Sequence, residues 1–488
     1  MSTHLKIGLI QSSPATADFP NNLRQIVQGY RECLDHGADL VVASAYALCG
    51  AEPKALASRA SYLRQSEAAL DNLSRELGDT PLILAAYTPV FEEDDEFVAQ
   101  LVSSQVGVLT PMLLENGEIT ELSELDTVEI NGCSVYVDFS SEISPGHDTS
   151  KPEVEELDLL IHLSTAPWYA GAAAAEEDEY KWQAQDCGIP VICVHHVGTA
   201  DGNIYAGGSA VYSPQGTTLA RLPFFENCNR VVTLNARTQA KALPTEQELL
   251  CRALERGIRD TVRSNGYGGV SLNLDSPHAD LLAAICTEAL GRSNVVGITG
   301  NSESHIAKAL RITCHPLPLA PLQAQAAECL GEASEELSSR ISAVLQFTLA
   351  EKRGLMHLSA LTRRDLMTGN FTLYGESCAH FAPFGNLYEM DLYLLRKYLH
   401  EKYADLFGPL KEPNSPETDR IIHELTDCNI SATALLHERI SPFSENDVRI
   451  IQRKIIASAL KRTQTPMVLH ADRPSERHTL PVAHRMND

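Results

Sequence analysis

The sequence predicts a two-domain α/β protein, with a layered α-β-β-α domain followed by a domain built on a parallel sheet. Short apolar strands alternate with helical stretches in the first half of the chain. The composition turns polar between residues 236 and 245, and an order of helix, strand, helix and strand follows. The length agrees, because 488 residues are enough for two to four domains at about 150 residues each.

The elements of the first domain follow from the spacing of its apolar residues, which differs between strands and helices. Strands are expected at 6–11, 38–44, 81–87, 133–139, 157–164, 190–195 and 207–213, and helices at 21–37 and 59–77. The strands are mostly apolar, as strands covered on one or both faces are. This domain is expected to end near Asn235.

The second domain is expected to begin with a helix, because Pro244 precedes a helical run. Helices are expected at 246–265, 279–290, 323–352, 390–403 and 445–462, strands at 268–273 and 294–300, and a Pro-rich loop at 408–415. The order strand, helix, strand is the opening of a parallel-sheet unit. The sequence is therefore divided into domains at 1–237 and 238–488.

Charge and composition exclude several classes of function. Lys and Arg number 39 against 64 Asp and Glu, a formal net charge of -25, so no nucleic-acid partner is expected. The sequence contains no run of about 18 apolar residues, so no membrane partner is expected. The 12 cysteines form no C-x-x-C pair, which predicts buried free thiols, and the opening residues show no export signal. A cytoplasmic location is expected.

No metal site is expected from the cysteines and histidines. Cys193 and His195 share one face of a strand, while His196 points to the other face. No Cys or His pair at zinc spacing accompanies them. Cys133 is expected in the core.

Several motifs in this order resemble the glutamine-dependent NAD synthetase family. The motifs of the first half are Ala38-Asp-Leu-Val-Val42 with Gly50, and Leu163-Ser-Thr-Ala-Pro167. Those of the second half are Asn294-Val-Val-Gly297 after Ala289-Leu-Gly291, Phe371-Thr-Leu-Tyr-Gly-Glu376 before Phe381-Ala-Pro383, and Lys461-Arg-Thr-Gln-Thr-Pro466. The resemblance implies a nitrilase-like α-β-β-α sandwich followed by a Rossmann-like (adenine nucleotide α-hydrolase-like) parallel-sheet domain. It also implies an amidase that frees ammonia from glutamine, and a synthetase that uses ATP with Mg and deamido-NAD.

The residues that the resemblance requires of the amidase are replaced. The family's catalytic glutamate falls on Ala45, and its nucleophilic cysteine falls on Ser140. The family's lysine has no counterpart, since no lysine occurs between Lys54 and Lys151. A serine nucleophile needs a strong base within reach, and the base position is an alanine.

The phosphate loop of the synthetase is replaced as well. The family's Ser-Gly-Gly-x-Asp-Ser loop falls on Leu274-Asp-Ser-Pro-His-Ala279, or, with a three-residue insertion, on 271–276. In either alignment, other residues stand at the positions of the glycines that let backbone N–H groups approach phosphates. The altered positions are Asp275, Ser276 and His278, and a family lysine falls on Glu389.

The sequence therefore favours a pseudoenzyme, a homologue of the family with both catalytic centres degenerate. It is expected to act through oligomeric assembly, scaffolding or regulation, as a homo-oligomer or with an active paralogue or another protein. No cofactor is expected; ATP with Mg and deamido-NAD would bind only if the remnant site still takes them.

Two alternatives remain open from the sequence. The first is a sensor of a nucleotide or deamido-NAD, with Thr372, Tyr374 and Glu376 as ligand contacts, although these residues could instead hold a helix-loop corner. The second is an enzyme with altered chemistry, which would use Ser140, or Asp275 and His278 on one helical face. Whether the pockets are open or filled is not determined by the sequence.

Overall fold

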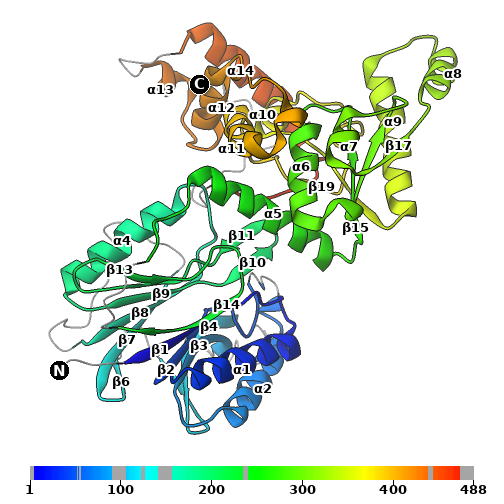
Figure 1. Ribbon diagram of the computed structural model, residues 1–488. Coiled ribbons are helices and arrows are strands. Elements are labelled where there is room, and N and C mark those ends of the chain that lie inside the picture. Colours follow the sequence, from blue (N-terminus) through cyan, green and yellow to red (C-terminus); the bar gives the residue numbers. More distant parts are fainter. Residues whose placement is uncertain are drawn as a thin grey trace, which may run out of the picture. The chain divides into compact units, whose positions relative to one another are not determined.

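The computed structural model describes residues 5–51, 53, 56–90, 106–122, 127–140, 157–234, 240–437 and 443–472. The chain divides into two compact units, Met1–Pro244 and Thr245–Asp488. The boundary expected between residues 237 and 238 lies outside the described residues. Both units combine sheets with covering helices (Figure 1).

Two six-stranded sheets lie at the centre of the first unit, within the ranges given above. The strands are β1 Lys6–Gln11, β2 Leu40–Ala43, β3 Leu82–Val90, β4 Val106–Glu115, β5 Glu118–Glu121, β6 Thr127–Ile130, β7 Cys133–Ser140, β8 Leu159–Ser164, β9 Val191–Val194, β10 Val197–Ala200, β11 Asn203–Ala206, β12 Ala210–Tyr212, β13 Thr218–Arg221 and β14 Cys228–Thr233. Their orders are β14-β1-β2-β3-β4-β5 and β13-β12-β9-β8-β7-β6, and β10 and β11 form a separate hairpin.

The alternation of side chains along each strand builds the layers of this unit. In β1, Ile7 and Leu9 enter the core between the two sheets, whereas Ile10 packs on the opposite face under helices α1 (Phe19–Asp35) and α2 (Ala60–Glu76). Helix α4 (Ala172–Cys187) covers the outer face of the second sheet (Figure 1). The predicted α-β-β-α sandwich is confirmed.

The second unit contains a parallel sheet in the order β17-β16-β15-β18-β19-β20, with strands β15 Gly269–Asn273, β16 Val295–Thr299, β17 Thr313–Pro316, β18 Leu355–Leu358, β19 Phe381–Ala382 and β20 Met467–Val468. Strand β15 pairs in parallel with β16 on one side and with β18 on the other. The direction in which strands are added therefore reverses at β15. Ligands of open α/β sheets bind at such a point, beyond the carboxyl ends of the strands.

The helices of the second unit are α5 Glu246–Ser264, α6 Ala279–Leu290, α7 His305–Leu310, α8 Ala320–Leu330, α9 Glu335–Lys352, α10 Arg363–Thr368, α11 Glu389–Phe407, α12 Pro416–Thr426, α13 Ala432–His437, α14 Glu445–Ala457 and α15 Ala459–Arg462. The prediction of one helix at 323–352 is wrong. Gly331 ends α8 with a φ of 75°, and the Ser334 side chain caps α9 by accepting from Leu337 N.

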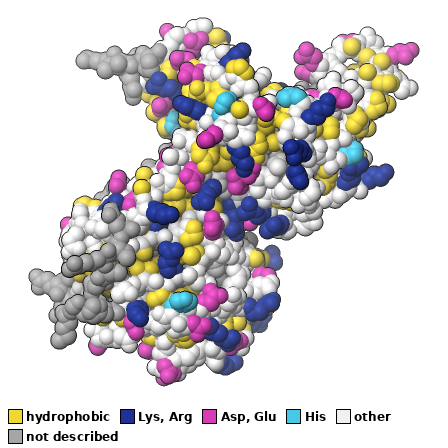
Figure 2. Space-filling view, in the orientation of Figure 1, with side chains coloured by type: hydrophobic (Ala, Val, Ile, Leu, Met, Phe, Trp, Pro, Cys, Tyr) yellow, Lys and Arg dark blue, Asp and Glu magenta, His cyan; other side chains and the backbone are white. Residues whose placement is uncertain are grey.

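The cysteines are free, as predicted, but not all of them are buried. Cys133 lies in the core between the sheets, as expected. Cys329 and Cys428 are exposed, so the prediction of burial is wrong for them. On the face shown in Figure 2, Lys and Arg side chains occur in separate groups with acidic side chains between them. None of the described helices is long and apolar enough to cross a membrane.

Candidate functional site

The first predicted centre lies at the carboxyl ends of strands in the sandwich. Ala45, two residues after β2, is fully buried in the core between the sheets. Ser140 is the last residue of β7, and it pairs with Ser164 of the parallel strand β8. The methyl side chain of Ala45 cannot accept a proton. The two predicted positions therefore contain no acid-base pair for nucleophilic attack.

Aromatic side chains pack together around Tyr46, the residue that follows Ala45. The ring of Tyr46 meets that of His196 edge to face, with centroids 4.9 Å apart, and the His196 and Tyr205 centroids are 3.9 Å apart. Burial, with a smaller contribution from His195, lowers the pKa of His196 to about 3. The imidazole is therefore neutral at pH 7, and it carries no positive charge for an oxyanion.

Cys193 and His195 lie under α4, and their Sγ and Nε2 atoms are 2.7 Å apart. The carboxyl group of Glu176, on α4, is 3.7 Å from the same nitrogen, and burial raises its pKa to about 8. Burial raises the pKa of the Cys193 thiol well above its usual range and lowers that of His195 to about 3. A neutral buried thiol is a poor nucleophile. Among the described residues, no group of three or more His, Cys, Asp and Glu side chains is arranged to hold a metal ion.

The loop between β15 and α6 occupies the predicted phosphate-binding position. Asp275 turns toward the end of β16, where it accepts hydrogen bonds from Thr299 Oγ1 at 2.7 Å and Gly300 N at 2.6 Å. Ser276 donates to the carbonyl of Asn273 at 2.8 Å. Both polar side chains are thus engaged by the loop itself and by the neighbouring strand.

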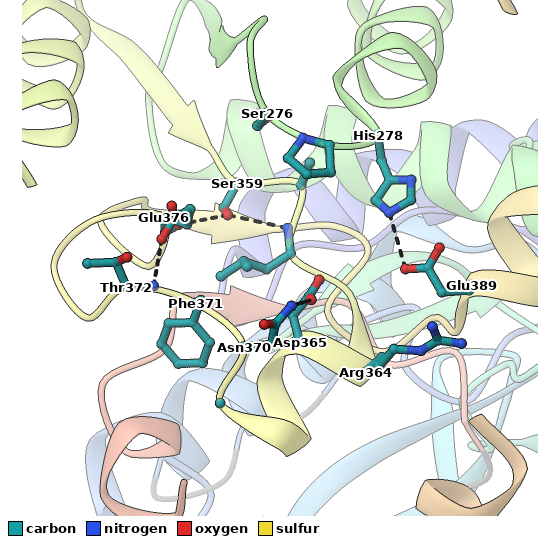
Figure 3. A pocket seen from close by; sticks show the side chains of 14 residues that line it. Ser276, His278, Ser359, Arg364, Asp365, Asn370, Phe371, Thr372, Glu376 and Glu389 are labelled. Carbon is teal, nitrogen blue, oxygen red and sulfur yellow. Dashed lines mark hydrogen bonds and ion pairs between the residues drawn. The ribbon is translucent and has the colours of Figure 1, made fainter. Parts of the chain in front are cut away.

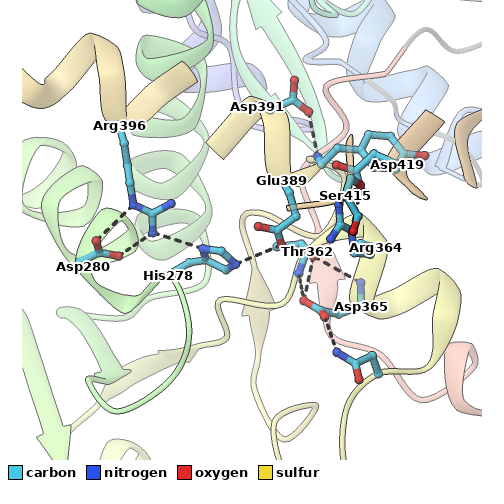
Figure 4. Close-up of polar contacts among 12 residues, drawn as sticks. His278, Asp280, Thr362, Arg364, Asp365, Glu389, Asp391, Arg396, Ser415 and Asp419 are labelled. Atoms are coloured by element: carbon cyan, nitrogen blue, oxygen red, sulfur yellow. Dashed lines mark hydrogen bonds and ion pairs between the residues drawn. The ribbon is translucent and has the colours of Figure 1, made fainter. Parts of the chain in front are cut away.

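His278 ends this loop with a φ of 58° and joins it to α11 (Figure 4). Its Nδ1 is 3.2 Å from a nitrogen of Arg396, and its Nε2 is 3.2 Å from Oε1 of Glu389. A guanidinium can only donate, so Nδ1 accepts and Nε2 carries the proton that it donates to Glu389. These bonds assign a neutral imidazole. Arg396 also donates to both carboxylate oxygens of Asp280, at 3.2 and 2.7 Å.

The hypothesis that Asp275 and His278 form a catalytic pair is wrong in this structure. Asp275 bonds toward β16, and both ring nitrogens of His278 are engaged by Arg396 and Glu389. The left-handed backbone of His278 ends the loop before α6 begins, so the two residues do not share a helical face.

A cavity of about 590 Å³ opens beside His278, at the carboxyl ends of β15 and β18 (Figure 3). It is lined by Ser276, Pro277, His278, Ser359, Ala360, Leu361, Arg364, Asp365, Gly369, Asn370, Phe371, Thr372, Glu376 and Glu389. Its volume is within the range of roughly 300–1,000 Å³ that is typical of small-molecule sites. The predicted positions Ser276, His278, Glu389, Thr372 and Glu376 therefore meet around one open cavity.

The cationic side chains around this cavity are bound to other groups of the protein. Arg364 Nε donates to Asp419 at 2.7 Å, and Arg363 is paired with the buried Asp427. Lys461 Nζ donates to the carbonyls of Gly369 and Phe371 at 3.0 and 2.8 Å. A triphosphate needs free cations and approachable N–H groups. The residues present do not fit ATP with Mg.

Of the predicted ligand contacts, Thr372 and Glu376 line the cavity, while Tyr374 is not among the lining residues. Glu376 accepts from Thr372 N at 2.6 Å and from Ser339 Oγ at 2.9 Å. Tyr374 is 58% exposed and donates from its hydroxyl to Gln464 at 3.2 Å. These contacts also hold the loop corner, which was the alternative left open by the sequence.

The sequence motifs do not single out Arg364, Asp365, Asp280 and Arg396. A local signal existed for Asp365, because Thr362 and Asp365 form a capping box at the start of α10. No local signal exists for Arg396, whose partners His278 and Asp280 are more than a hundred residues away in the chain.

Comparison with known proteins relates both units to one family. The NAD synthase family model matches residues 250–404. The glutamine-dependent NAD(+) synthetase of Synechocystis sp. is 26% identical over 459 residues, which cover 81% of this chain and 81% of that protein. The protein of the same name from Thermotoga maritima is 26% identical over 465 residues, covering 81% and 80%.

Solved structures show the same fold. A glutamine-dependent NAD(+) synthetase from Cytophaga hutchinsonii has a TM-score of 0.80 at 13% identity and covers 99% of this chain and 98% of its own. That of Acinetobacter baumannii in complex with adenosine diphosphate has a TM-score of 0.74 at 18% identity, covering 97% and 96%.

Proposed function

Because the chain belongs to the family of the glutamine-dependent NAD(+) synthetases, we propose that it is a non-catalytic member, which acts through assembly with other subunits. It keeps the sandwich and the parallel-sheet unit of the family. The altered residues are those that the family resemblance assigns to chemistry. The observation that carries the proposal is Ala45, fully buried at the position of the general base.

The amidase half of the proposal rests on three missing functions. Ala45 removes the base, and the ring of the next residue, Tyr46, packs on His196, which is neutral at pH 7. Ser140 replaces the thiol, and no lysine occurs in 55–150 to hold an oxyanion. Removing one such group from a hydrolytic site costs on the order of a hundredfold or more in rate.

The synthetase half of the proposal rests on the loop before α6. Leu274, Asp275 and Pro277 stand in the loop where phosphate cradles have glycines, and Asp275 and Glu389 add negative charge. Phosphate groups bind at helix N-termini only where the backbone N–H groups can be approached. We therefore propose that ATP and deamido-NAD are not converted here.

The role that remains is binding to proteins. We propose that the chain forms a homo-oligomer, dimer or higher, or associates with an active relative whose activity it regulates. Its free cysteines suit a reducing compartment such as the cytoplasm.

The test is an assay of NAD formation from deamido-NAD, Mg-ATP and either glutamine or ammonium, with the Thermotoga maritima relative as positive control. We expect no NAD with either nitrogen donor. NAD formed from ammonium alone would contradict the synthetase half, and glutamine hydrolysis would contradict the amidase half. Light scattering after size exclusion tests assembly, and a monomer at every concentration would contradict the homo-oligomer.

A second candidate function is ligand binding without turnover. The cavity of about 590 Å³ favours it, because polar and apolar side chains together line an open space. Thermal unfolding with and without candidate ligands tests it, since a ligand at a hundred times its Kd stabilises by about 2.7 kcal/mol. Unchanged unfolding midpoints with all ligands would contradict it.

A further inference from the structure

The charges that line the cavity beside β15 determine which class of ligand it can take. Three carboxylates line it, those of Asp365, Glu376 and Glu389. His278 is neutral in its present hydrogen bonds, because Arg396 donates to its Nδ1. This leaves Arg364 as the one cation among the lining residues.

Arg364 is itself directed away from a ligand by its partners. Its Nε donates to Asp419 Oδ1 at 2.7 Å, and one terminal nitrogen donates to the Ser415 carbonyl at 3.1 Å. Asp419 is buried, with a side chain 7% exposed, so its charge neutralises the guanidinium. Lys461 and Arg396 bond to lining residues, but they are not lining residues themselves, and Arg396 is paired with Asp280. The side chains that line the cavity therefore carry three carboxylates against one cation that is already paired.

The cavity also has an apolar part. Pro277, Leu361 and Phe371 contribute hydrophobic groups to the lining, and Phe371 is buried. Apolar walls with a few convergent polar groups are typical of ligand sites. The cavity lies where strand order reverses at β15, which is the usual ligand position in such sheets.

We propose that this cavity binds a small organic cation, an amine or amidine joined to an apolar group, in preference to a phosphate ester or a carboxylate. Both oxygens of Asp365 accept hydrogen bonds within the protein, from Thr362 and Asn370. The cation would lie near Glu376 and Glu389, whose carboxylates can accept further hydrogen bonds, and the apolar group against Leu361 and Phe371. The inference rests on the second candidate function above, ligand binding without turnover.

Three probes of one shape and different charge test the proposal: benzamidine (positive), benzamide (neutral) and benzoate (negative). Calorimetric titration of the full chain at constant ionic strength measures each Kd, with ATP as a fourth ligand. We expect benzamidine to bind at least about tenfold more tightly than benzoate, because charge-assisted hydrogen bonds are roughly twice as strong as neutral ones.

Isosteric variants locate the binding. Glu376→Gln and Glu389→Gln should each weaken the binding of benzamidine about fivefold or more. The binding of benzamide should not change, because each substitution removes only a charge. Glu336→Gln, at an exposed position on α9 with a side chain 71% exposed, is the matched control and should change nothing.

The outcomes separate the two claims. Benzoate or ATP binding as tightly as benzamidine would overturn the cation preference and leave ligand binding standing. No binding of any probe at millimolar concentration would overturn both. If benzamidine binding weakened equally in the Glu336→Gln control, the attraction would come from the whole acidic chain. That result would also contradict binding in this cavity.

Discussion

The Nε2 atom of His278 donates to Oε1 of Glu389 at 3.2 Å, and this contact joins the loop after β15 to the first residue of α11. Burial acts to raise the pKa of Glu389, but the hydrogen bond from His278, with smaller contributions from neighbouring charges that include Arg364 and Arg396, holds it below its ordinary value. The carboxylate is thus the form that these partners stabilise. It stands where the family resemblance places a lysine.

Glu389→Lys is expected to destabilise the second unit by about 2 kcal/mol or more, because a third cation would meet Arg364 and Arg396 and leave the His278 proton without an acceptor. Glu389→Gln, which keeps an acceptor, should cost about 1 kcal/mol or less. Urea unfolding measures both. A lysine variant as stable as the parent would show that this position is not adapted to a negative charge.

Arg363→Ala is expected to cost about 3–5 kcal/mol, because it leaves the buried carboxylate of Asp427 without its cation. The Asp427 side chain is 3% exposed. The exposed pair Lys308 and Glu303 offers the matched control, and Lys308→Ala should change stability by less than about 0.5 kcal/mol. Equal losses of unfolding free energy for the two variants in chemical denaturation would refute the claim that Arg363 compensates the buried charge of Asp427.

The same pair predicts loss of stability in acid. Burial acts to raise the pKa of Asp427, but hydrogen bonds from His423, Arg363 and Tyr388 and the charge of Arg363 hold it well below its ordinary value. A depressed folded-state pKa gives stability that is present above the unfolded pKa of about 4 and is lost as pH falls below it. Asp427→Asn should therefore be less stable at pH 7 and lose less on acidification to pH 3.

Buried histidines predict a second loss at milder pH. Burial, with smaller contributions from neighbouring histidines, lowers the pKa of His195 and His196 to about 3 and that of His357 to about 4. Unfolded histidine titrates near 6.5, so the unfolded state binds more protons below that pH, and stability falls as pH falls.

His196→Phe tests this, since it keeps a ring between Tyr46 and Tyr205 and removes the titration. The loss of unfolding free energy between pH 7 and 5 should shrink by about 2 kcal/mol. His36→Gln, which replaces an exposed histidine, is the comparison variant. An unaltered slope in His196→Phe would argue against a neutral buried imidazole.

Gly50 offers a test of backbone packing. Its φ is 76°, and an added Cβ would lie 2.3 Å from the Cα of Thr16. Gly132 has a φ of 74° with nothing within 4 Å of an added Cβ. Gly132→Ala should cost about 1 kcal/mol for the left-handed backbone alone, and Gly50→Ala about 3 kcal/mol or more. Similar thermal shifts for both would contradict the clash.

The sequence by itself determined the fold class and much of the element order. The strand expected at 6–11 is β1 and the helix expected at 279–290 is α6, both with the predicted bounds. Their periodicity is a local property, because it depends on residues two to four apart. The expected helix at 323–352 failed where Gly331 adopts a left-handed backbone, a choice that apolar spacing does not encode.

Only the tertiary structure decided which side chains meet. The sequence singled out His278, Glu389, Thr372 and Glu376 one by one, but it did not show that they surround one open cavity. His278 and Glu389 are 111 residues apart, and their contact depends on the path of the chain through the sheet. The partners of Asp275 and Arg364 lie on neighbouring elements in the same way, so the charge of the cavity follows from packing and not from composition.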